Sequence, residues 1–164
     1  EVWRIPLIVR QPGATPTTQN AFVTILDVGE TLFSLTGSAA TPEKPRCGRD
    51  LLPLVGTAET PESWASVAYG VYDLYNGICF AVRAIRNERW KYVWNPQDIN
   101  ELYDLKSDPH ELTNLAGDEE FAPVRNGLHE QLLAWLQEIG DPLPEQVPLL
   151  PPAGTVIATG NPGP

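Results

Sequence analysis

The chain has 164 residues, is 42% hydrophobic and carries a formal net charge of −10 at pH 7. This length suits one ordinary domain, and this apolar content can build a core, so the composition excludes a disordered chain. The acidic charge argues against a nucleic-acid partner, whose phosphates need clustered Lys and Arg, and against adsorption to an anionic membrane. No apolar run approaches the roughly 18 residues of a membrane span.

Cysteine and histidine are scarce. Cys47 and Cys79 are the two cysteines, which is too few for a disulfide framework, so the compartment stays open. His110 and His129 are the two histidines, so this chain alone cannot build a three-histidine metal site. Residue 1 is Glu and the chain contains no Met, so we expect the natural start to lie upstream.

The N-terminal part predicts a strand, a helix and a long loop. Residues 3–10 (WRIPLIVR) are apolar and precede Gln-Pro-Gly, as in a strand that is covered on both faces in a larger parallel sheet. Residues 20–36 have apolar side chains near helical spacing, and Gly37 suits the left-handed residue after a helix. Residues 38–63 predict a long loop with one helical turn at 48–54. Loops of this length often serve a function.

Four strands are predicted next, at residues 67–72, 78–86, 89–95 and 101–105. Asn87 and Glu88 form a tight connection, so the second and third strands should make an antiparallel hairpin. Trp90, Tyr92 and Trp94 recur with a period of two, which places the three aromatic rings on one face of the sheet.

A second helix is predicted at about residues 119–139. Its apolar stripe contains Val124, Leu128, Leu132, Trp135, Leu136 and Ile139. We expect the aromatic face of the hairpin to pack on this stripe, which gives an α+β fold with an antiparallel four-stranded sheet on a long C-terminal helix. Residues 141–164 hold seven prolines and predict an extended arm or a disordered tail.

The motifs of several enzyme classes are missing: the Walker-type phosphate loop, GxGxxG, HExxH, the calcium loop and the GxSxG elbow. His110 and His129 each precede Glu, as in a zinc motif, but Asn114 and Leu133 stand where the second His is needed. We therefore predict surface or capping roles for both histidines.

The sequence gives little indication of a reactive cysteine. Cys47 lies between Arg46 and Arg49, and such basic neighbours can lower a thiol pKa. We favour the simpler interpretation of a loop thiol, and we interpret Cys79 as a small core residue.

Four cations lie on the predicted hairpin, at Arg83, Arg86, Arg89 and Lys91. They suit an anion such as sulfate. We favour the alternative that they pair with nearby carboxylates, for instance those of Asp98, Glu101 and Asp104.

A candidate substrate rim lies in the predicted link between the first two strands. It contains Tyr72, Asp73, Tyr75 and Asn76. Aromatic rings beside a carboxylate and an amide suit contacts with a sugar or an aryl group, although tyrosines that pack back on the sheet explain the pattern equally well.

Three stretches carry a family resemblance. They read RAIRNERWKYVWN at 83–95, ELYDL at 101–105 and DPHELTNLA at 108–116. Together they closely resemble the C-terminal subdomain of formylglycine-dependent sulfatases, in the alkaline-phosphatase superfamily. RIPLIVR at 4–10 resembles the strand that ends the catalytic α/β domain of these enzymes. GRDLLPL at 48–54, with the preceding helix, is similar to the helix and loop that come after that strand in the family.

The resemblance covers about residues 1–140 and implies a division of the chain. Residues 1–63 would be the last strand, helix and loop of a truncated α/β catalytic domain, and 64–140 the C-terminal sulfatase subdomain. The tail, 141–164, lies outside the resemblance.

The resemblance also implies that the chemistry lies elsewhere. Family members oxidise the Cys of C-x-[PS]-x-R to formylglycine, bind a calcium-like divalent ion through Asp and Asn, and hold sulfate with Lys and His. All these groups precede the strand at 4–10, and Cys47, followed by Gly-Arg-Asp-Leu, does not fit the motif. We therefore expect no catalytic and no metal-binding residue in this chain. The expected partners are a missing N-terminal sulfatase domain and a small sulfated substrate.

Two functional hypotheses are compatible with this pattern. In the first, the parent protein hydrolyses sulfate esters by metal-assisted chemistry, and this chain completes its fold and shapes the pocket rim. A related phosphoric or phosphonic ester hydrolase is the sister alternative. In the second, the chain is a non-catalytic binding module that uses Trp90, Tyr92 and Trp94 as a contact platform. The isolated chain should expose an apolar patch at residues 3–10 and 22–36.

Overall fold

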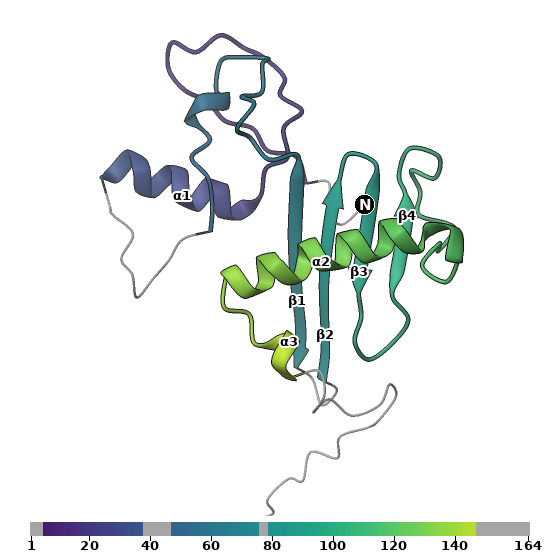
Figure 1. The fold of residues 1–164 in the computed structure, drawn as a ribbon. Coiled ribbons are helices and arrows are strands. Elements are labelled where there is room, and N and C mark those ends of the chain that lie inside the picture. Colours follow the sequence, from purple (N-terminus) through teal and green to yellow (C-terminus); the bar gives the residue numbers. More distant parts are fainter. Residues whose placement is uncertain (1–4, 38–46, 76–78, 147–164) are drawn as a thin grey trace, which may run out of the picture. The chain divides into compact units, whose positions relative to one another are not determined.

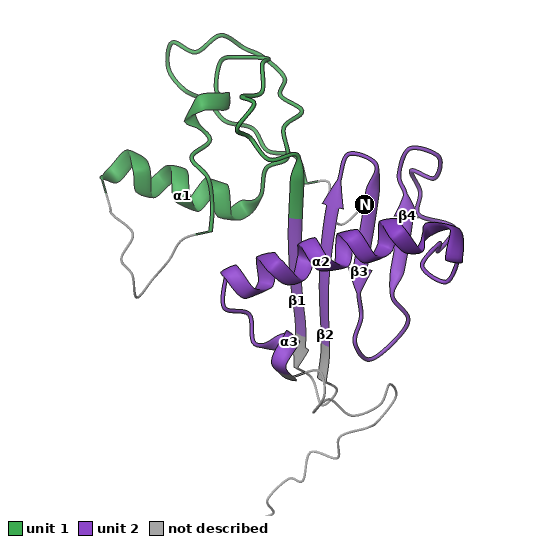
Figure 2. Ribbon diagram, in the orientation of Figure 1, with its two compact units in different colours: residues 1–68 green, residues 69–164 purple. Residues whose placement is uncertain are grey.

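The computed structural model describes residues 5–37, 47–75 and 79–146. The chain divides into two compact units, Glu1–Ala68 and Tyr69–Pro164 (Figure 2). The first unit contains helix α1 and a short 3-10 helix, and the second contains helices α2 and α3 and most of a four-stranded sheet.

The strand predicted at residues 3–10 is not formed in its described part. Residues 5–10 belong to no helix or strand, and their apolar side chains are largely exposed. A strand exists only through backbone hydrogen bonds to a neighbouring strand. The described part of the first unit offers residues 5–10 no such neighbour, so the β-forming sequence stays extended and unpaired.

Helix α1 spans Ile25–Thr36 and begins five residues later than predicted. Its start is set by a capping box, in which the Asp27 carboxylate accepts a 2.7 Å hydrogen bond from the backbone N–H of Thr24. Its end agrees with the prediction, because Gly37 has a φ of 69° and donates its N–H to carbonyls of the last turn.

The loop after α1 contains a short 3-10 helix, Leu52–Leu54, where one helical turn was predicted. Leu51 and Leu54 are buried there. Gly48 runs so close to α1 that an added Cβ would lie 2.1 Å from the carbonyl oxygen of Leu26. Only glycine fits at this contact, which brings the GRDLLPL segment against the helix.

The sheet has the order β1-β2-β3-β4, with strands Val67–Tyr75, Cys79–Asn87, Trp90–Trp94 and Glu101–Asp104 (Figure 1). All four predicted strands are confirmed, and β1 runs three residues further than predicted. β2 and β3 are antiparallel, with Arg86 opposite Lys91, and β3 and β4 are antiparallel. Asn87 closes the hairpin, because its side-chain oxygen accepts hydrogen bonds from the backbone N–H groups of Arg89 and Trp90.

Helix α2, Ala122–Glu138, follows the 3-10 helix Glu119–Phe121 and crosses one face of the sheet (Figure 1). Its buried residues are Leu128, Leu132 and Leu136, which recur every four residues. They share the core with the fully buried Ile85, Tyr92 and Leu102 of the sheet. The predicted packing of the hairpin's aromatic face on this helix is confirmed.

The chain continues to fold past the point where the tail was predicted to begin. After Gly140, with a φ of 69°, the short helix α3 spans Leu143–Gln146, and the side chain of Leu143 is buried. The rest of the predicted tail, 147–164, lies outside the described residues. Among the described helices none combines the length and the apolar character that a membrane span needs.

Candidate functional site

The structure places two of the four predicted rim residues. Tyr72 and Asp73 lie in strand β1 rather than in the link that follows it, and both side chains are more than half exposed. Consecutive strand residues point to opposite faces of a sheet, so the two side chains diverge. The backbone of Tyr75 ends β1, whereas its side chain and all of Asn76 lie outside the described residues.

Asp73 has a contact that the sequence did not suggest. The guanidinium of Arg83 lies between two carboxylates. Its Nη1 and Nη2 are 2.6 and 3.3 Å from the oxygens of Asp73, and its Nε and Nη2 are 2.9 and 3.2 Å from those of Asp141. Burial by itself lowers the pKa of Arg83, but the hydrogen bonds to both carboxylates raise it above its usual value. The arginine, which is 3% exposed, therefore stays charged inside the structure.

The contacts among Arg83, Asp73 and Asp141 also explain why the ordered structure extends beyond residue 140. Asp141 Oδ1 also accepts the backbone N–H of Leu143 at 2.9 Å, at the start of α3. Arg83 thus joins β1, β2 and the connection between α2 and α3. Asp141 was predicted to belong to the tail because prolines dominate its surroundings, and its separation of 58 residues from Arg83 carries no local signal.

Two more of the hairpin cations, Arg89 and Lys91, are also held by carboxylates. Arg89 Nη2 lies 2.9 Å from Asp104 Oδ2, and the hydrogen bond from Arg89 is the main cause of a lowered pKa of Asp104. Lys91 forms an ion pair with Glu111. The predicted pairing with nearby carboxylates is confirmed for Arg83, Arg89 and Lys91, and these three do not form a vacant anion site.

The prediction of a surface or capping role for His129 is wrong. Its ring lies between α2 and β3, edge-on to Tyr92 and Trp94 at centroid distances of 5.7 and 5.3 Å. Burial raises the pKa of Tyr92 to about 12 and lowers the pKa of His129. The Tyr92 hydroxyl therefore stays protonated, and it lies 3.2 Å from Nδ1 of the histidine. Helical spacing is the sequence feature that could have placed His129 against the sheet, because position 129 lies three residues before the buried Leu132.

This packing contradicts the contact-platform hypothesis. Tyr92 is 1% exposed and Trp94 is buried as well, while the ring of Trp90 contacts Phe121 at a centroid distance of 5.8 Å. Rings that already lie beneath a helix cannot serve as an open surface for a ligand. The period-two pattern correctly predicts a shared face, and that face belongs to the core.

The first unit has a buried charge cluster of its own. Asp27, 2% exposed, accepts a 2.7 Å hydrogen bond from the backbone N–H of Arg49 and pairs with its guanidinium at 3.3 Å. The same guanidinium donates to the carbonyl of Phe22 at 2.9 Å and lies 4.2 Å from the ring of Trp64. Asp27 was not among the predicted site residues, although the Thr-x-x-Asp spacing of a capping box marks it.

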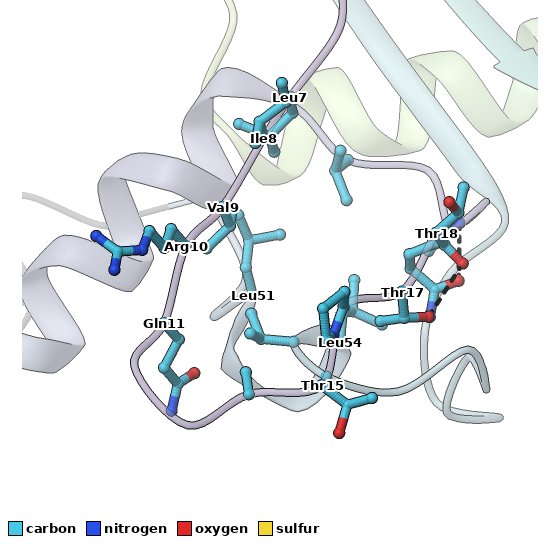
Figure 3. Close-up of a pocket in the computed structure, with 17 residues that line it drawn as sticks. Leu7, Ile8, Val9, Arg10, Gln11, Thr15, Thr17, Thr18, Leu51 and Leu54 are labelled. Atoms are coloured by element: carbon cyan, nitrogen blue, oxygen red, sulfur yellow. Dashed lines mark hydrogen bonds between the residues drawn. The ribbon is translucent and has the colours of Figure 1, made fainter.

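A cavity of about 540 Å³ opens in the first unit (Figure 3). Leu7, Val9, Leu51 and Leu54 contribute apolar walls, and Arg10 is the charged residue among those that line it. The described lining includes no His, Cys, Asp or Glu side chain, so it offers neither an acid–base pair nor a metal ligand.

The remaining candidates are isolated. Cys47 and His110 are exposed in loops, the latter as predicted. Over the described ranges, no three His, Cys, Asp or Glu side chains come together in a group that could hold a metal ion. The described residues therefore do not fit a calcium-like ion, and we assign no step of a reaction to such an ion in this chain.

Comparison with known proteins identifies the family. The family model described as N-sulphoglucosamine sulphohydrolase, C-terminal, matches residues 1–138. The chain belongs to this family. The resemblance to the C-terminal portion of sulfatases is thereby confirmed, as is the α+β fold with its antiparallel sheet and C-terminal helix.

Among curated sulfatases, the chain is 36% identical over 114 residues to the choline-sulfatase of Rhizobium meliloti, covering 69% of this chain and 21% of that protein. It is 32% identical over 146 residues to the uncharacterised sulfatase YidJ of Escherichia coli, covering 87% of this chain and 28% of that protein. The chain thus spans about a quarter of the length of these relatives.

Solved structures share this fold. A protein in complex with its substrate D-glucosamine-2-N,6-O-disulfate matches with a TM-score of 0.71 and 28% identity, over 84% of this chain and 29% of that one. The phosphonate monoester hydrolase of Agrobacterium radiobacter matches with a TM-score of 0.62 and 32% identity, over 72% of this chain and 25% of that one.

The sulfatase motifs of this chain have structural tasks. In the 83–95 stretch, Arg83 and Arg89 form the ion pairs described above. In the 108–116 stretch, Asn114 accepts the backbone N–H of Leu102 at 3.0 Å and donates to the carbonyl of Asn100 at 3.0 Å, which ties this segment to β4. These motif residues tie the strands to one another and to the segment that follows β4.

Proposed function

We propose that this chain is the C-terminal part of a hydrolase of sulfate esters, either a sulfated carbohydrate or an aryl sulfate. The match to the sulfatase C-terminal family over residues 1–138 supports this, as do relatives named sulfatases in three bacteria. In this proposal the chain completes the fold and contributes to the rim of the substrate pocket.

One observation supports a scaffold role for the motif residues of this chain. The charged side chains of the motifs pair with carboxylates inside the second unit, at Arg83–Asp141, Arg89–Asp104 and Lys91–Glu111. A cation that is bound to a carboxylate is not available to hold a sulfate oxygen. This supports a scaffold role for the described residues, with the reacting groups in another part of the protein.

We place formylglycine and the divalent ion of the family in the part of the protein that relatives carry before the matched region. Together they would supply a nucleophile and electrostatic stabilisation of the charge that builds on the sulfate oxygens. The contribution proposed for this chain is to bind and orient the non-reacting part of the substrate.

Tyr72 is the described rim residue that suits this task best. It is exposed, and it presents an aromatic ring with a hydroxyl group near the end of the strand that leads into the β1–β2 connection. Asp73 is bound on one side by Arg83, so its carboxylate is oriented and suits accepting a hydrogen bond from a sugar hydroxyl. Tyr75 and Asn76 stay predictions.

A phosphoric or phosphonic ester hydrolase is the second candidate. A specific observation supports this alternative: the Agrobacterium radiobacter phosphonate monoester hydrolase is 32% identical to the chain, with a TM-score of 0.62. A curated relative from Trinickia caryophylli is described as a multifunctional alkaline phosphatase superfamily protein. The same scaffold therefore occurs beside more than one ester chemistry.

The assay that tests the proposal uses the longest product of the gene, produced with a formylglycine-generating enzyme. It is offered 4-nitrophenyl sulfate and the phenyl ester of a phosphonate in parallel, with calcium added. We expect the sulfate ester to have the higher kcat/KM. Hydrolysis of the phosphonate ester alone would move the protein to the sister family, and hydrolysis of neither ester would contradict both assignments.

A further inference from the structure

All three nitrogens of the Arg83 guanidinium form hydrogen bonds within the second unit. Nη2 donates to both Asp73 and Asp141, whereas Nε donates to Asp141 alone. Nη1 donates to Asp73 and to the backbone carbonyl oxygens of Tyr72 and Val82, which lie 3.4 and 3.1 Å away. A guanidinium has five N–H groups, and these contacts use them all. Arg83 therefore orients its neighbours and does not itself hold a substrate anion.

The two carboxylates that Arg83 binds differ in their surroundings. The side chain of Asp141 is 7% exposed, and that of Asp73 is 55% exposed. Asp141 is also fixed through the backbone, because its N–H donates to the carbonyl of Leu136 at 2.9 Å and its Oδ1 accepts the N–H of Leu143. The contacts thus lead from a buried and fixed carboxylate, through a buried guanidinium, to an exposed carboxylate.

Asp73 therefore has a fixed direction although it lies at the surface. Its two oxygens accept N–H groups of Arg83 at 2.6 and 3.3 Å, so the guanidinium sets the plane of the carboxylate. A surface aspartate without such a partner samples several rotamers, and ordering it when a ligand binds costs free energy. Each carboxylate oxygen also has a second lone pair, which can accept a further hydrogen bond. Asp73 is thus an acceptor that is oriented before any ligand arrives.

This acceptor lies near the end of an edge strand. β1 is at one edge of the sheet, and Asp73 is two residues before the end of the strand at Tyr75. An edge strand has a hydrogen-bonded neighbour on one side only. The contacts of Arg83 with the carbonyl of Tyr72 and with the carboxylate of Asp73 give this part of β1 a second anchor.

The charge of the cluster decides which chemical group can bind to it. Asp73 and Asp141 contribute two negative charges and Arg83 one positive charge, so one negative charge is left over. This excess repels a sulfate group and favours a hydroxyl group, which can donate its hydrogen to the carboxylate. A sugar carries such hydroxyl groups, whereas a simple aryl sulfate such as 4-nitrophenyl sulfate carries none.

We propose that Arg83 and Asp141 are positioning residues for Asp73, and that Asp73 determines specificity by accepting a hydroxyl group of the substrate and disfavouring a second sulfate group at that place. This inference rests on the proposed function and deepens it. A sugar with a free hydroxyl group at this place is preferred over an aryl sulfate and over a sugar with a sulfate group there.

The test uses the longest product of the gene, produced with a formylglycine-generating enzyme. The substrates are a panel of hexose monosulfates, with 4-nitrophenyl sulfate as the reference. The quantity measured is the kcat/KM of the best hexose sulfate divided by the kcat/KM of the reference. This ratio does not depend on the amount of folded enzyme, so a variant that folds less completely still gives a valid value.

Asp141→Asn and Arg83→Lys are compared with Arg89→Lys, which changes the separate ion pair with Asp104. Lysine keeps the charge of arginine but cannot bind two carboxylates through paired N–H groups. We expect the first two variants to lower the ratio about tenfold, through a higher KM for the hexose sulfate, because the substrate must then order Asp73 itself. Arg89→Lys should keep the wild-type ratio. A purely structural role would change both substrates equally and leave the ratio unchanged.

Asp73→Asn tests the specificity directly, and it replaces an exposed side chain, so the fold should persist. Asparagine keeps an acceptor oxygen but removes the negative charge. We expect the kcat/KM of the disulfates of the same hexose to rise about tenfold relative to that of the monosulfate.

The possible failures can be told apart. An unchanged ratio in Asp141→Asn and Arg83→Lys, or an equal fall in Arg89→Lys, would overturn the positioning role, and an unchanged preference in Asp73→Asn would overturn the specificity role. Wild-type enzyme that cleaves 4-nitrophenyl sulfate but no hexose sulfate would overturn this inference and keep the proposed function. Cleavage of no sulfate ester would remove the proposed function, and this inference with it.

Discussion

The main helices of the two units, α1 and α2, bury opposite kinds of side chain. In the second unit the centre is apolar, with Tyr92, Leu102 and Leu132 at its core. In the first unit helix α1 buries the carboxylate of Asp27 and exposes Ile25 and Leu32. Hydrophobic burial is the main favourable term in folding, so the second unit holds its own driving force for folding. Helix α1 of the first unit is held to the loop at 49–51 by hydrogen bonds and an ion pair, whose net contribution is smaller.

A match to a family model therefore does not show which part of a chain buries an apolar core of its own. Both units match the same family model, yet the apolar side chains of α1 are exposed whereas those of α2 are buried. Substitutions at equivalent residue types in the two units should therefore have very different effects on stability.

The largest effect is expected at the buried cation of the second unit. Arg83→Met removes the partner of Asp141 and leaves a buried carboxylate without its positive neighbour. Breaking a buried ion pair in this way lowers the free energy of unfolding by about 3–5 kcal/mol. Urea unfolding followed by far-ultraviolet circular dichroism measures the change.

Arg89→Met on the same hairpin is the matched control. The Arg89 side chain is largely exposed, so water can replace part of its contact with Asp104, and the loss should be clearly smaller. If the two variants lost equal free energy of unfolding, the ion pairs of Arg83 would contribute no more to stability than the exposed pair of Arg89 and Asp104.

A pair of identical substitutions tests the contrast between the helices directly. Leu132→Ala in α2 removes a side chain that is 0% exposed, and should cost about 3 kcal/mol in the free energy of unfolding. Leu32→Ala in α1 removes an exposed side chain and should cost less than about 1 kcal/mol. Similar values from urea unfolding of the 164-residue chain would show that α1 is packed as firmly as α2, against the comparison of the units.

The smallest effect concerns pH. Burial lowers the pKa of His129, so below its ordinary pKa of 6.5 the unfolded chain binds a proton that the folded chain binds less readily. The stability that this residue contributes is present above 6.5 and is lost as the pH falls through the lower folded pKa. Between about pH 7.5 and about pH 5.5, wild type should therefore lose more stability than His129→Gln.

His110→Gln serves as the control for this measurement. His110 is exposed in a turn, so the variant should keep the wild-type pH dependence. Parallel stability curves for wild type and His129→Gln would contradict a half-buried ring with a lowered pKa at position 129.

Much of the second unit could be predicted from sequence because its signals are local. Alternation of period two marks a half-buried strand, the two residues after a strand mark a hairpin, and leucines every four residues mark a covered helix. For the same reason the cations at 83, 89 and 91 could be expected to pair with carboxylates. Asp104 could be named as a partner because it lies nearby in sequence, whereas Asp141 and Glu111 could not.

The remaining features depend on contacts that local patterns do not contain. Residues 5–10 have the composition of a strand, but a strand also requires a neighbour, and propensity says nothing about whether one is present. The start of α1 was placed too early because apolar spacing continues back past Thr24, while the capping contact of Asp27 ends the extended chain there. The inward polar stripe of α1 depends on the loop at 49–51.

The sequence alone thus determined the family, the four strands, the existence of both long helices and the pairing of the hairpin's charges. These features follow from periodicity, composition and motifs within short windows. The tertiary structure alone decided that His129 is half-buried against Tyr92 and Trp94, that Asp27 is buried, that Arg83 reaches Asp141 and that α1 presents its apolar half outward. The physical reason is that burial depends on which distant segments meet, and a residue's own neighbours in sequence do not record that.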